Sequence, residues 1–225
     1  MQLALFDLDH TLLDGDSDSL WFRFLTEQGA VDADQLAEER ARHSRDYRAG
    51  RMDVARFYDL VLRPLAQHEP GQLHAWREQF VRERILPRIA TEARALLRRH
   101  RDAGHTLLIV TATNRFITEP IARELEVPHL LATELEQDGN RFTGRVAGIP
   151  CFREGKLSHL REWLYQENIT PAETWFYSDS QNDLPLLEYV DHPVAVNPDP
   201  VLTELALRRG WPVMQLRCSQ HIIPG

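Results

Sequence analysis

A short apolar run that ends in two aspartates is the feature that most constrains this chain. Leu3, Ala4, Leu5 and Phe6 are followed by an Asp-Leu-Asp sequence at residues 7–9. The run is too short for a surface helix but long enough for a buried strand. Residues two apart on a strand point to the same side, so both carboxylates can converge beyond its carboxyl end. Open α/β sheets bind their ligands at that edge.

Two carboxylates held close together repel each other, and one pKa rises unless they share a cation. We therefore interpret Asp7 and Asp9 as a Mg²⁺ site in which one carboxylate can act as a nucleophile. A calcium loop is excluded, because the sixth position counted from Asp7 is Leu12 rather than glycine and the twelfth is Asp18 rather than glutamate. For this motif alone, a strand that ends in a solvated acidic loop remains the alternative.

The size, charge and composition of the chain limit the classes of protein to which it can belong. Its 225 residues can bury a sizeable core, as one domain or one domain with an insert. A net charge of −8 argues against a nucleic-acid surface and leaves any phosphate to be held by local groups. No run of about eighteen apolar residues predicts a membrane span, and the start of the chain is unlike a secretory signal. Cys151 and Cys218 lack metal-type spacing, so we expect both to be reduced in a cytoplasmic protein.

Residues 17–87 carry helical spacing throughout. Apolar positions recur at helical intervals within residues 20–25, 54–62 and 73–86, and the charged stretch 34–48 predicts a solvated helix. Pro64 and the Pro70-Gly71 pair predict turns. This part of the chain is interpreted as a small helical cap domain inserted after the acidic motif.

After Pro87, helices and strands alternate. We expect helices at 89–103, from about 118 to 126 and at 156–167, with strands at 106–110, 174–177, 194–196 and 213–216. The second helix is placed from Thr118 so that Pro120 falls in its first turn. Asp138-Gly139-Asn140 predicts a hairpin turn within residues 130–146. Alternation of this kind predicts an α/β fold with a doubly wound, mostly parallel, Rossmann-like sheet, formed by residues 1–16 and 88–225.

Polar residues follow the predicted strand at 106–110. Thr111 offers a hydroxyl, and the small residue Ala112 lets backbone N–H groups approach a phosphate oxygen closely. Capping of the next helix by Thr113 or Asn114 is the alternative.

Two more candidate groups lie further along the chain. Lys156 begins a predicted helix, where a cation opposes the helix dipole unless an anion is nearby; a solvated lysine is the alternative, and Arg153 is a possible substitute. Asp179 follows the strand at 174–177, a position suited to Mg²⁺, and Asp183 could orient the ligands of that ion. An N-capping aspartate is the alternative for this segment.

Taken together, the motifs DLDHTLLDGDS, IVTATN, FREGK and YSDSQNDLP resemble the four motifs of haloacid-dehalogenase-like hydrolases. The similarity is greatest to the phosphoserine-phosphatase-like branch, in which a helical cap follows the first motif, and it covers nearly the whole chain. It implies a Mg²⁺-dependent phosphomonoesterase that works through an aspartyl-phosphate intermediate. A phosphotransferase with the same intermediate and a non-enzymatic binding protein are the alternatives.

The resemblance also implies a role for each matching residue. Asp7 is implied as the nucleophile and Asp9 as the general acid–base. Mg²⁺ is implied to bind the Asp7 carboxylate, the Asp9 carbonyl and Asp179, with Asp183 supporting its water shell. The groups implied to bind the phosphoryl group or the substrate are Thr111, Ala112, Lys156 and Asn182.

The chain departs from phosphoserine phosphatases at two positions. Asp16 stands where those enzymes have a glutamate, and Val61 stands where a cap arginine holds the serine carboxylate. An unpaired carboxylate is costly in a closed pocket, so the absence of the arginine argues against phosphoserine as the substrate. Phosphoserine remains the alternative. Asp14, Asp16 and Asp18 instead suit a cationic leaving group. The DLDxTLLxGDSD start is similar to that of histidinol-phosphate phosphatases, so histidinol phosphate is the expected substrate among small phosphate monoesters.

Overall fold

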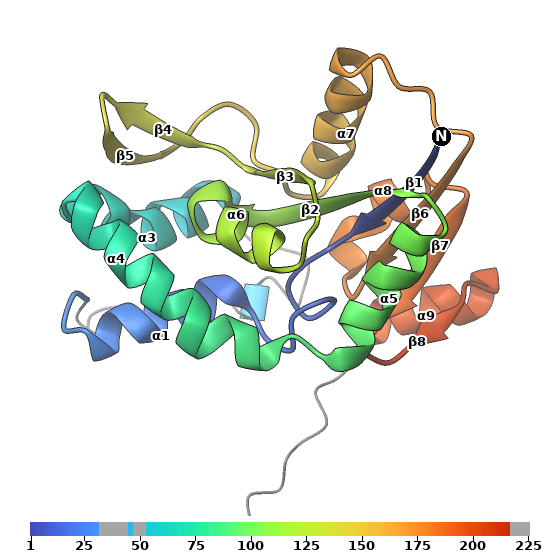
Figure 1. Cartoon of the computed structure of the whole chain (residues 1–225), viewed down its shortest axis with the longest axis horizontal. Coiled ribbons are helices and arrows are strands. Elements are labelled where there is room, and N and C mark those ends of the chain that lie inside the picture. Colours follow the sequence, from blue (N-terminus) through green and yellow to red (C-terminus); the bar gives the residue numbers. More distant parts are fainter. Residues whose placement is uncertain (32–44, 47–52, 217–225) are drawn as a thin grey trace, which may run out of the picture.

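The computed structural model describes residues 1–31, 45–46 and 53–216. Its centre is a sheet in which every pair of neighbouring strands is parallel, in the order β3-β2-β1-β6-β7-β8 (Figure 1). The strands are β1 (Gln2–Phe6), β2 (Thr106–Asn114), β3 (His129–Thr133), β6 (Glu173–Ser178), β7 (His192–Val196) and β8 (Val213–Met214). The doubly wound, Rossmann-like sheet expected from the sequence is confirmed.

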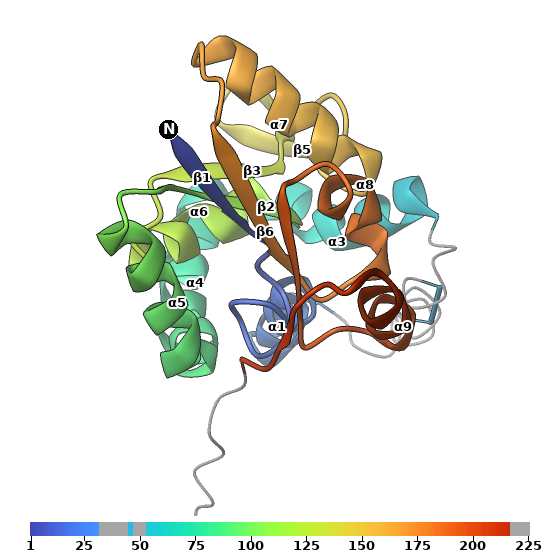
Figure 2. The same cartoon turned by 90° about the vertical axis from the view of Figure 1, so that its right-hand side faces the viewer.

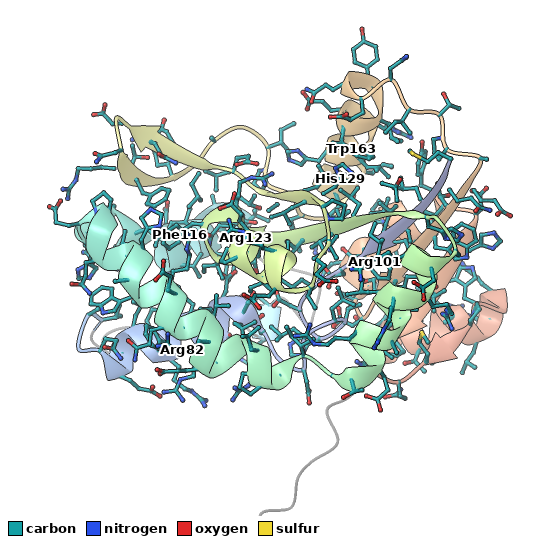
Figure 3. All side chains as sticks on the ribbon, viewed as in Figure 1. Arg82, Arg101, Phe116, Arg123, His129 and Trp163 are labelled. Atoms are coloured by element: carbon teal, nitrogen blue, oxygen red, sulfur yellow. The ribbon has the colours of Figure 1, made fainter. Side chains whose placement is uncertain are left out.

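Both faces of the sheet are buried, which explains why its strands are continuously apolar. Leu3 and Leu5 of β1 pack into one cluster, whereas Ala4 and Phe6 pack into another, because alternate residues of a strand point to opposite faces. The first face is covered by α7 (Glu154–Gln166), α8 (Leu184–Leu187) and α9 (Pro200–Arg209), and the second by α5 (Thr91–Asp102) and α6 (Arg115–Glu124) (Figure 2). In Figure 3, the labelled His129 and Trp163 lie between β3 and α7, with ring centroids 5.1 Å apart.

The strand order reverses beside β1. The chain adds β2 and β3 on one side of β1, then crosses back to place β6, β7 and β8 on the other. Asp7 directly follows β1 and Asp179 directly follows β6, so both lie at the same carboxyl edge of adjacent strands. Doubly wound sheets bind their ligands at such a point of reversal.

The predicted cap region contains helices and no strand among its described residues. These helices are α1 (Ser17–Glu27), α3 (Val54–Gln67) and α4 (Pro70–Phe80), which continues into the π-helical η1 (Val81–Ile85) and the 3₁₀ turn η2 (Leu86–Arg88). The expectation of a solvated helix at 34–48 lies outside the described residues, apart from 45–46. The predicted hairpin is confirmed: β4 (Leu135–Asp138) and β5 (Arg141–Val146) pair antiparallel around Gly139 and Asn140, and β5 packs on α3.

The helical region enters and leaves the sheet domain side by side. The N–H of Asp14 donates to the carbonyl of Arg88 at 2.9 Å, and Leu13 forms a β-bridge with Ile89. The two connections between the helical region and the sheet domain, near residues 14 and 88, therefore lie next to each other. Of the helices in the described ranges, none is both long and apolar enough to cross a bilayer. The cytoplasmic location stays a prediction.

Three local expectations were wrong. Pro64 lies inside α3 rather than at a turn, because the packing of this helix on β5 outweighs one missing N–H. Strand β2 continues to Asn114, with a register irregularity between Val110 and Asn114. Helix α6 begins at Arg115 instead of Thr118, since the Asn114 side chain accepts a hydrogen bond from the N–H of Ile117 and caps the helix.

This earlier start places Pro120 in the interior of α6, where it has no N–H to donate to the carbonyl of Phe116. Arg77 on α4 supplies the missing donor: its Nη1 lies 3.0 Å from that carbonyl oxygen. The Arg77 guanidinium also lies 4.6 Å from the centroid of the Phe116 ring, which is labelled in Figure 3. Arg77, which lies 39 positions before Phe116 in the sequence, thus compensates for the proline.

This compensation predicts that Arg77→Met destabilises the protein by about 1–3 kcal/mol, the typical cost of a buried carbonyl without a donor. Adding Pro120→Ala provides a backbone N–H at the same carbonyl, so the double variant should recover much of the loss. Urea unfolding of the wild type, both single variants and the double variant measures this coupling. Simple additivity of the two single changes would contradict the account.

Candidate active site

The candidate site is centred on a buried ion-pair network at the carboxyl edge of β1. The Nζ of Lys156 donates to Asp7 Oδ1 at 2.6 Å and to Asp183 Oδ2 at 2.7 Å. Ser178 Oγ donates to the same Asp183 oxygen at 2.6 Å. Lys156, Asp7 and Asp183 are each less than a tenth exposed, so the charges are paired inside the protein.

Asp9 is held by hydrogen bonds from two other elements. Its Oδ1 accepts from the backbone N–H of Ser17 at 2.7 Å, and its Oδ2 accepts from Thr113 Oγ1 at 2.9 Å. The same Thr113 oxygen lies 3.2 Å from Asp18 Oδ2. Asp9 is thus fixed between the start of α1 and the end of β2, beside Asp7.

Burial and mutual repulsion change the protonation of these carboxyl groups. Burial raises the pKa of Asp7 to about 7, against the opposing charge of Lys156 and with further increases from Asp183 and Asp9. Burial, followed by the charge of Asp16, raises the pKa of Asp9 to about 6. The pKa of Asp179 is also raised well above its ordinary value, by burial and then by the charge of Asp7. The Lys156 ammonium alone therefore leaves the site short of positive charge.

The chemistry of these donors fits a hard divalent cation. Asp7, Asp9, Asp179 and Asp183 offer only oxygen atoms, the ligands that Mg²⁺ prefers. The raised pKa values of Asp7, Asp9 and Asp179 indicate that a further positive charge would be stabilised there. In the described ranges, no three His, Cys, Asp or Glu side chains are arranged as a preformed metal cage. The Lys156 ammonium bridges two of the carboxylates instead.

Two of the predicted phosphate-binding residues, Thr111 and Ala112, lie on the irregular end of β2. Irregularities of this kind re-aim side chains at functional sites. Thr111 is buried, and its Oγ1 accepts from the N–H of Thr113 at 3.2 Å. The carbonyl of Ala112 accepts from Tyr58 Oη and from Thr133 Oγ1.

The remaining candidates have local structural roles. Asp16 caps α1, because its Oδ1 accepts from the N–H of Ser19 at 2.6 Å, and it is close enough to raise the pKa of Asp9. Asn182 is buried and accepts from Arg153 Nε at 3.1 Å. A substrate contact by either residue stays a prediction.

The segment before Lys156 is tightly constrained. Arg153 has a φ of +52°, a backbone conformation that is strained for a residue with a side chain. A Cβ atom on Gly155 would lie 2.0 Å from the carbonyl oxygen of Pro150. Glycine at this position is therefore needed for the start of α7, and this start places Lys156 beside Asp7.

Sequence reasoning missed four side chains that support the site: Ser17, Thr113, Ser178 and Tyr58. The sequence indicates Thr113 as a possible helix cap, and its spacing of two residues from Thr111 on one strand is a usable signal for a role in the site. Ser178 and Tyr58 gave none, because their roles depend on contacts between separate elements. Thr113, Ser178 and Tyr58 each donate a side-chain hydrogen bond to a candidate residue. Ser17 donates its backbone N–H to Asp9 and its hydroxyl to Thr113.

The chain is similar in sequence and in fold to known proteins. The sequence profile of the family described as haloacid dehalogenase-like hydrolase matches residues 4–188. A histidinol-phosphatase of Neisseria meningitidis serogroup C (strain 8013) is 40% identical over 220 residues, which cover 96% of this chain and 99% of that protein.

Two solved structures are similar over nearly the whole chain. A protein of unknown function from Bordetella pertussis Tohama I is 44% identical, with a TM-score of 0.90, and the match covers 96% of this chain and 98% of that one. A phospho-aspartyl intermediate analogue of phosphoserine phosphatase has a TM-score of 0.71 at 17% identity, over 96% of this chain and 94% of that one. The second likeness concerns the fold alone.

The close approach at Gly155 predicts a specific effect of a single methyl group. Gly155→Ala should lower the free energy of unfolding by about 1–3 kcal/mol, the usual cost of overpacking, and should weaken the binding of inorganic phosphate by displacing Lys156. Gly71→Ala is the matched control, since a Cβ there meets nothing within 4 Å. Denaturant unfolding and calorimetric titration with phosphate measure both effects. Unchanged stability and phosphate affinity in Gly155→Ala would contradict this account.

Proposed function

Because the chain belongs to the haloacid dehalogenase-like hydrolases, we propose that it is a Mg²⁺-dependent phosphomonoesterase whose best substrate is histidinol phosphate. The single observation that carries this proposal is the buried contact of Lys156 with Asp7, beside Asp9. This contact supports the proposal because Asp7 could act as the nucleophile, Lys156 could bind the phosphoryl oxygens and Asp9 could transfer the proton, all at one edge of the sheet.

In this mechanism, Asp7 attacks the phosphorus atom, and the bond from phosphorus to the ester oxygen breaks. An aspartyl-phosphate forms, and Asp9 donates its proton to the departing alcohol. Asp9 then accepts a proton from the water molecule that attacks the aspartyl-phosphate, which restores Asp7 and releases inorganic phosphate. A pKa of about 6 suits Asp9 to both transfers near neutral pH.

Lys156 and the end of β2 hold the phosphoryl group. The ammonium of Lys156 balances the charge that develops on the phosphoryl oxygens, and Thr111 donates its hydroxyl to one of them. Asp7, Asp179 and the backbone carbonyl of Asp9 would hold Mg²⁺, with Asp183 supporting its water ligands. When bound, this ion reduces the repulsion between the Asp7 carboxylate and the phosphate.

Residues 17–87 are proposed to act as a cap domain over the core formed by 1–16 and 88–225. The cap reaches the site at two points: Ser17 donates to Asp9, and Tyr58 donates to the carbonyl of Ala112. A cap seated there would exclude bulk water from the aspartyl-phosphate.

Three observations support histidinol phosphate over phosphoserine. The relative that is 40% identical is named as a histidinol-phosphatase. Asp14, Asp16 and Asp18 bring negative charge to the start of α1, which suits the amine of the substrate.

The third observation concerns α3, where Val61 stands at the position of the arginine that holds the serine carboxylate in phosphoserine phosphatases. No other arginine of α3 takes over that role. Its arginines at 56 and 63 are exposed, whereas Tyr58 and Leu62 on the same helix are buried. Neither arginine therefore faces the interior, where a substrate carboxylate would need a partner.

This proposal predicts that the protein releases phosphate from p-nitrophenyl phosphate in the presence of Mg²⁺ and that chelation with EDTA abolishes the release. Asp7→Asn should lower kcat by at least about a thousandfold, because the amide is not a nucleophile. Asp102→Asn, an exposed carboxylate on α5, is the matched control and should keep full activity. Activity that survives either chelation or Asp7→Asn would refute the mechanism.

A second prediction concerns the substrate. Across a panel of phosphate esters, kcat/KM for histidinol phosphate should exceed that for phosphoserine by about tenfold or more, equivalent to about 1.4 kcal/mol. Val61→Arg should raise kcat/KM for phosphoserine, while Val61→Leu should not. A wild-type preference for phosphoserine would overturn the substrate assignment but leave the phosphatase assignment intact.

A further inference from the structure

Tyr58 on α3 connects the helical region to the phosphate-binding end of β2. Its side chain is buried, with 4% of its surface exposed. The hydroxyl lies 2.9 Å from the carbonyl oxygen of Ala112 and 2.9 Å from Thr133 Oγ1, while Thr133 Oγ1 itself lies 2.7 Å from the same carbonyl. The N–H of Cys151 donates to Thr133 Oγ1 at 3.1 Å. The Tyr58–Ala112–Thr133 triangle thus joins α3, β2 and β3, and Cys151 connects it to the segment that leads to Lys156.

Hydrogen-bond directions within this triangle follow from the donors available. A carbonyl oxygen can only accept, so Thr133 donates its hydroxyl hydrogen to Ala112. Thr133 accepts from the N–H of Cys151, and Tyr58 donates its hydroxyl hydrogen to the carbonyl of Ala112. Burial raises the pKa of Tyr58 well above its ordinary value, which keeps this hydroxyl a donor at physiological pH.

The carbonyl of Ala112 controls the direction of the next N–H. Both groups belong to the single planar trans peptide between Ala112 and Thr113, so fixing the C=O also fixes the N–H, which points the opposite way. That N–H donates to Thr111 Oγ1 at 3.2 Å. With one lone pair of Thr111 taken in this way, its own hydroxyl hydrogen is left to donate to a phosphoryl oxygen.

We propose that Tyr58 is a positioning residue that couples the docking of α3 to the orientation of Thr111 through the Ala112–Thr113 peptide. This inference rests on the proposed function, because it assigns a phosphoryl group to Thr111. Docking of α3 supplies a donor to the Ala112 carbonyl, which turns the peptide toward Thr111 and favours phosphate binding. By thermodynamic reciprocity, bound phosphate favours the docked position of α3 to the same extent.

The test removes one hydroxyl and measures phosphate binding directly. Tyr58→Phe should weaken the affinity for inorganic phosphate by about five- to tenfold, as expected for one buried hydrogen bond, and should raise KM more than it lowers kcat. Thr133→Val should have a similar effect, whereas Thr133→Ser keeps the hydroxyl and should retain affinity. Tyr165→Phe is the matched control, because Tyr165 is 87% exposed.

A double-mutant cycle with Thr111→Val distinguishes positioning from a general loss of structure. If Tyr58 acts through Thr111, Tyr58→Phe should change phosphate affinity by less than about twofold in the Thr111→Val background. Hydrogen exchange in α3 should also slow on phosphate addition in the wild type but not in Tyr58→Phe.

Two results would overturn the inference: wild-type phosphate affinity in a folded Tyr58→Phe variant, or an equal loss in the Thr111→Val background. The proposed function fails in a different way. A wild-type protein that neither binds phosphate nor hydrolyses an aryl phosphate would reject that function and, with it, the coupling. A wild type that is active and a Tyr58→Phe variant that binds phosphate equally well reject the coupling alone.

Discussion

The site depends on one buried ammonium group held between two buried carboxylates. Lys156 is the third residue of α7, where the helix dipole opposes a cation. Its contacts with Asp7 and Asp183 reverse that preference, and Lys156 accordingly has a pKa well above its ordinary value. Loss of one partner from such a network typically costs about 3–5 kcal/mol, because a buried charge is left unpaired. The contact that keeps these buried charges paired thus also holds the candidate nucleophile in place.

The parallel sheet supplies the geometry for this network. Asp7 and Asp179 follow adjacent strands, and the 3₁₀ turn η3 (Gln181–Asp183) brings Asp183 back to the same edge. Helix α7 packs on the face of the sheet to which Leu3 and Leu5 point, and its first turn brings Lys156 to the same edge. Groups more than 140 residues apart in the sequence meet at a distance of 2.6 Å because the ends of parallel strands lie at one edge.

Much of the fold could be predicted from the sequence because its signals are local. The apolar run before Asp7, the turn at Gly139 and the start of the helix that carries Lys156 all depend on neighbouring residues. The start of α6 could not be predicted, since the missing N–H of Pro120 is replaced by Arg77, which lies 39 residues before the Phe116 carbonyl that it contacts. The contact between Thr113 and Asp9 spans 104 residues and depends on how two elements pack. Periodicity predicts elements, whereas these contacts require their relative positions.

The two adjacent connections of the helical region affect how such a chain can change over evolutionary time. Because Leu13 bridges Ile89, the ends of the intervening segment are already in contact, and the sheet domain could be closed by a very short linker in its place. Loop-closure entropy grows slowly with length, so segments of different sizes can be accommodated at this point at little cost to the sheet. An ancestral core could therefore have gained, lost or exchanged the inserted segment while the strand order and the carboxyl edge of the sheet stayed the same.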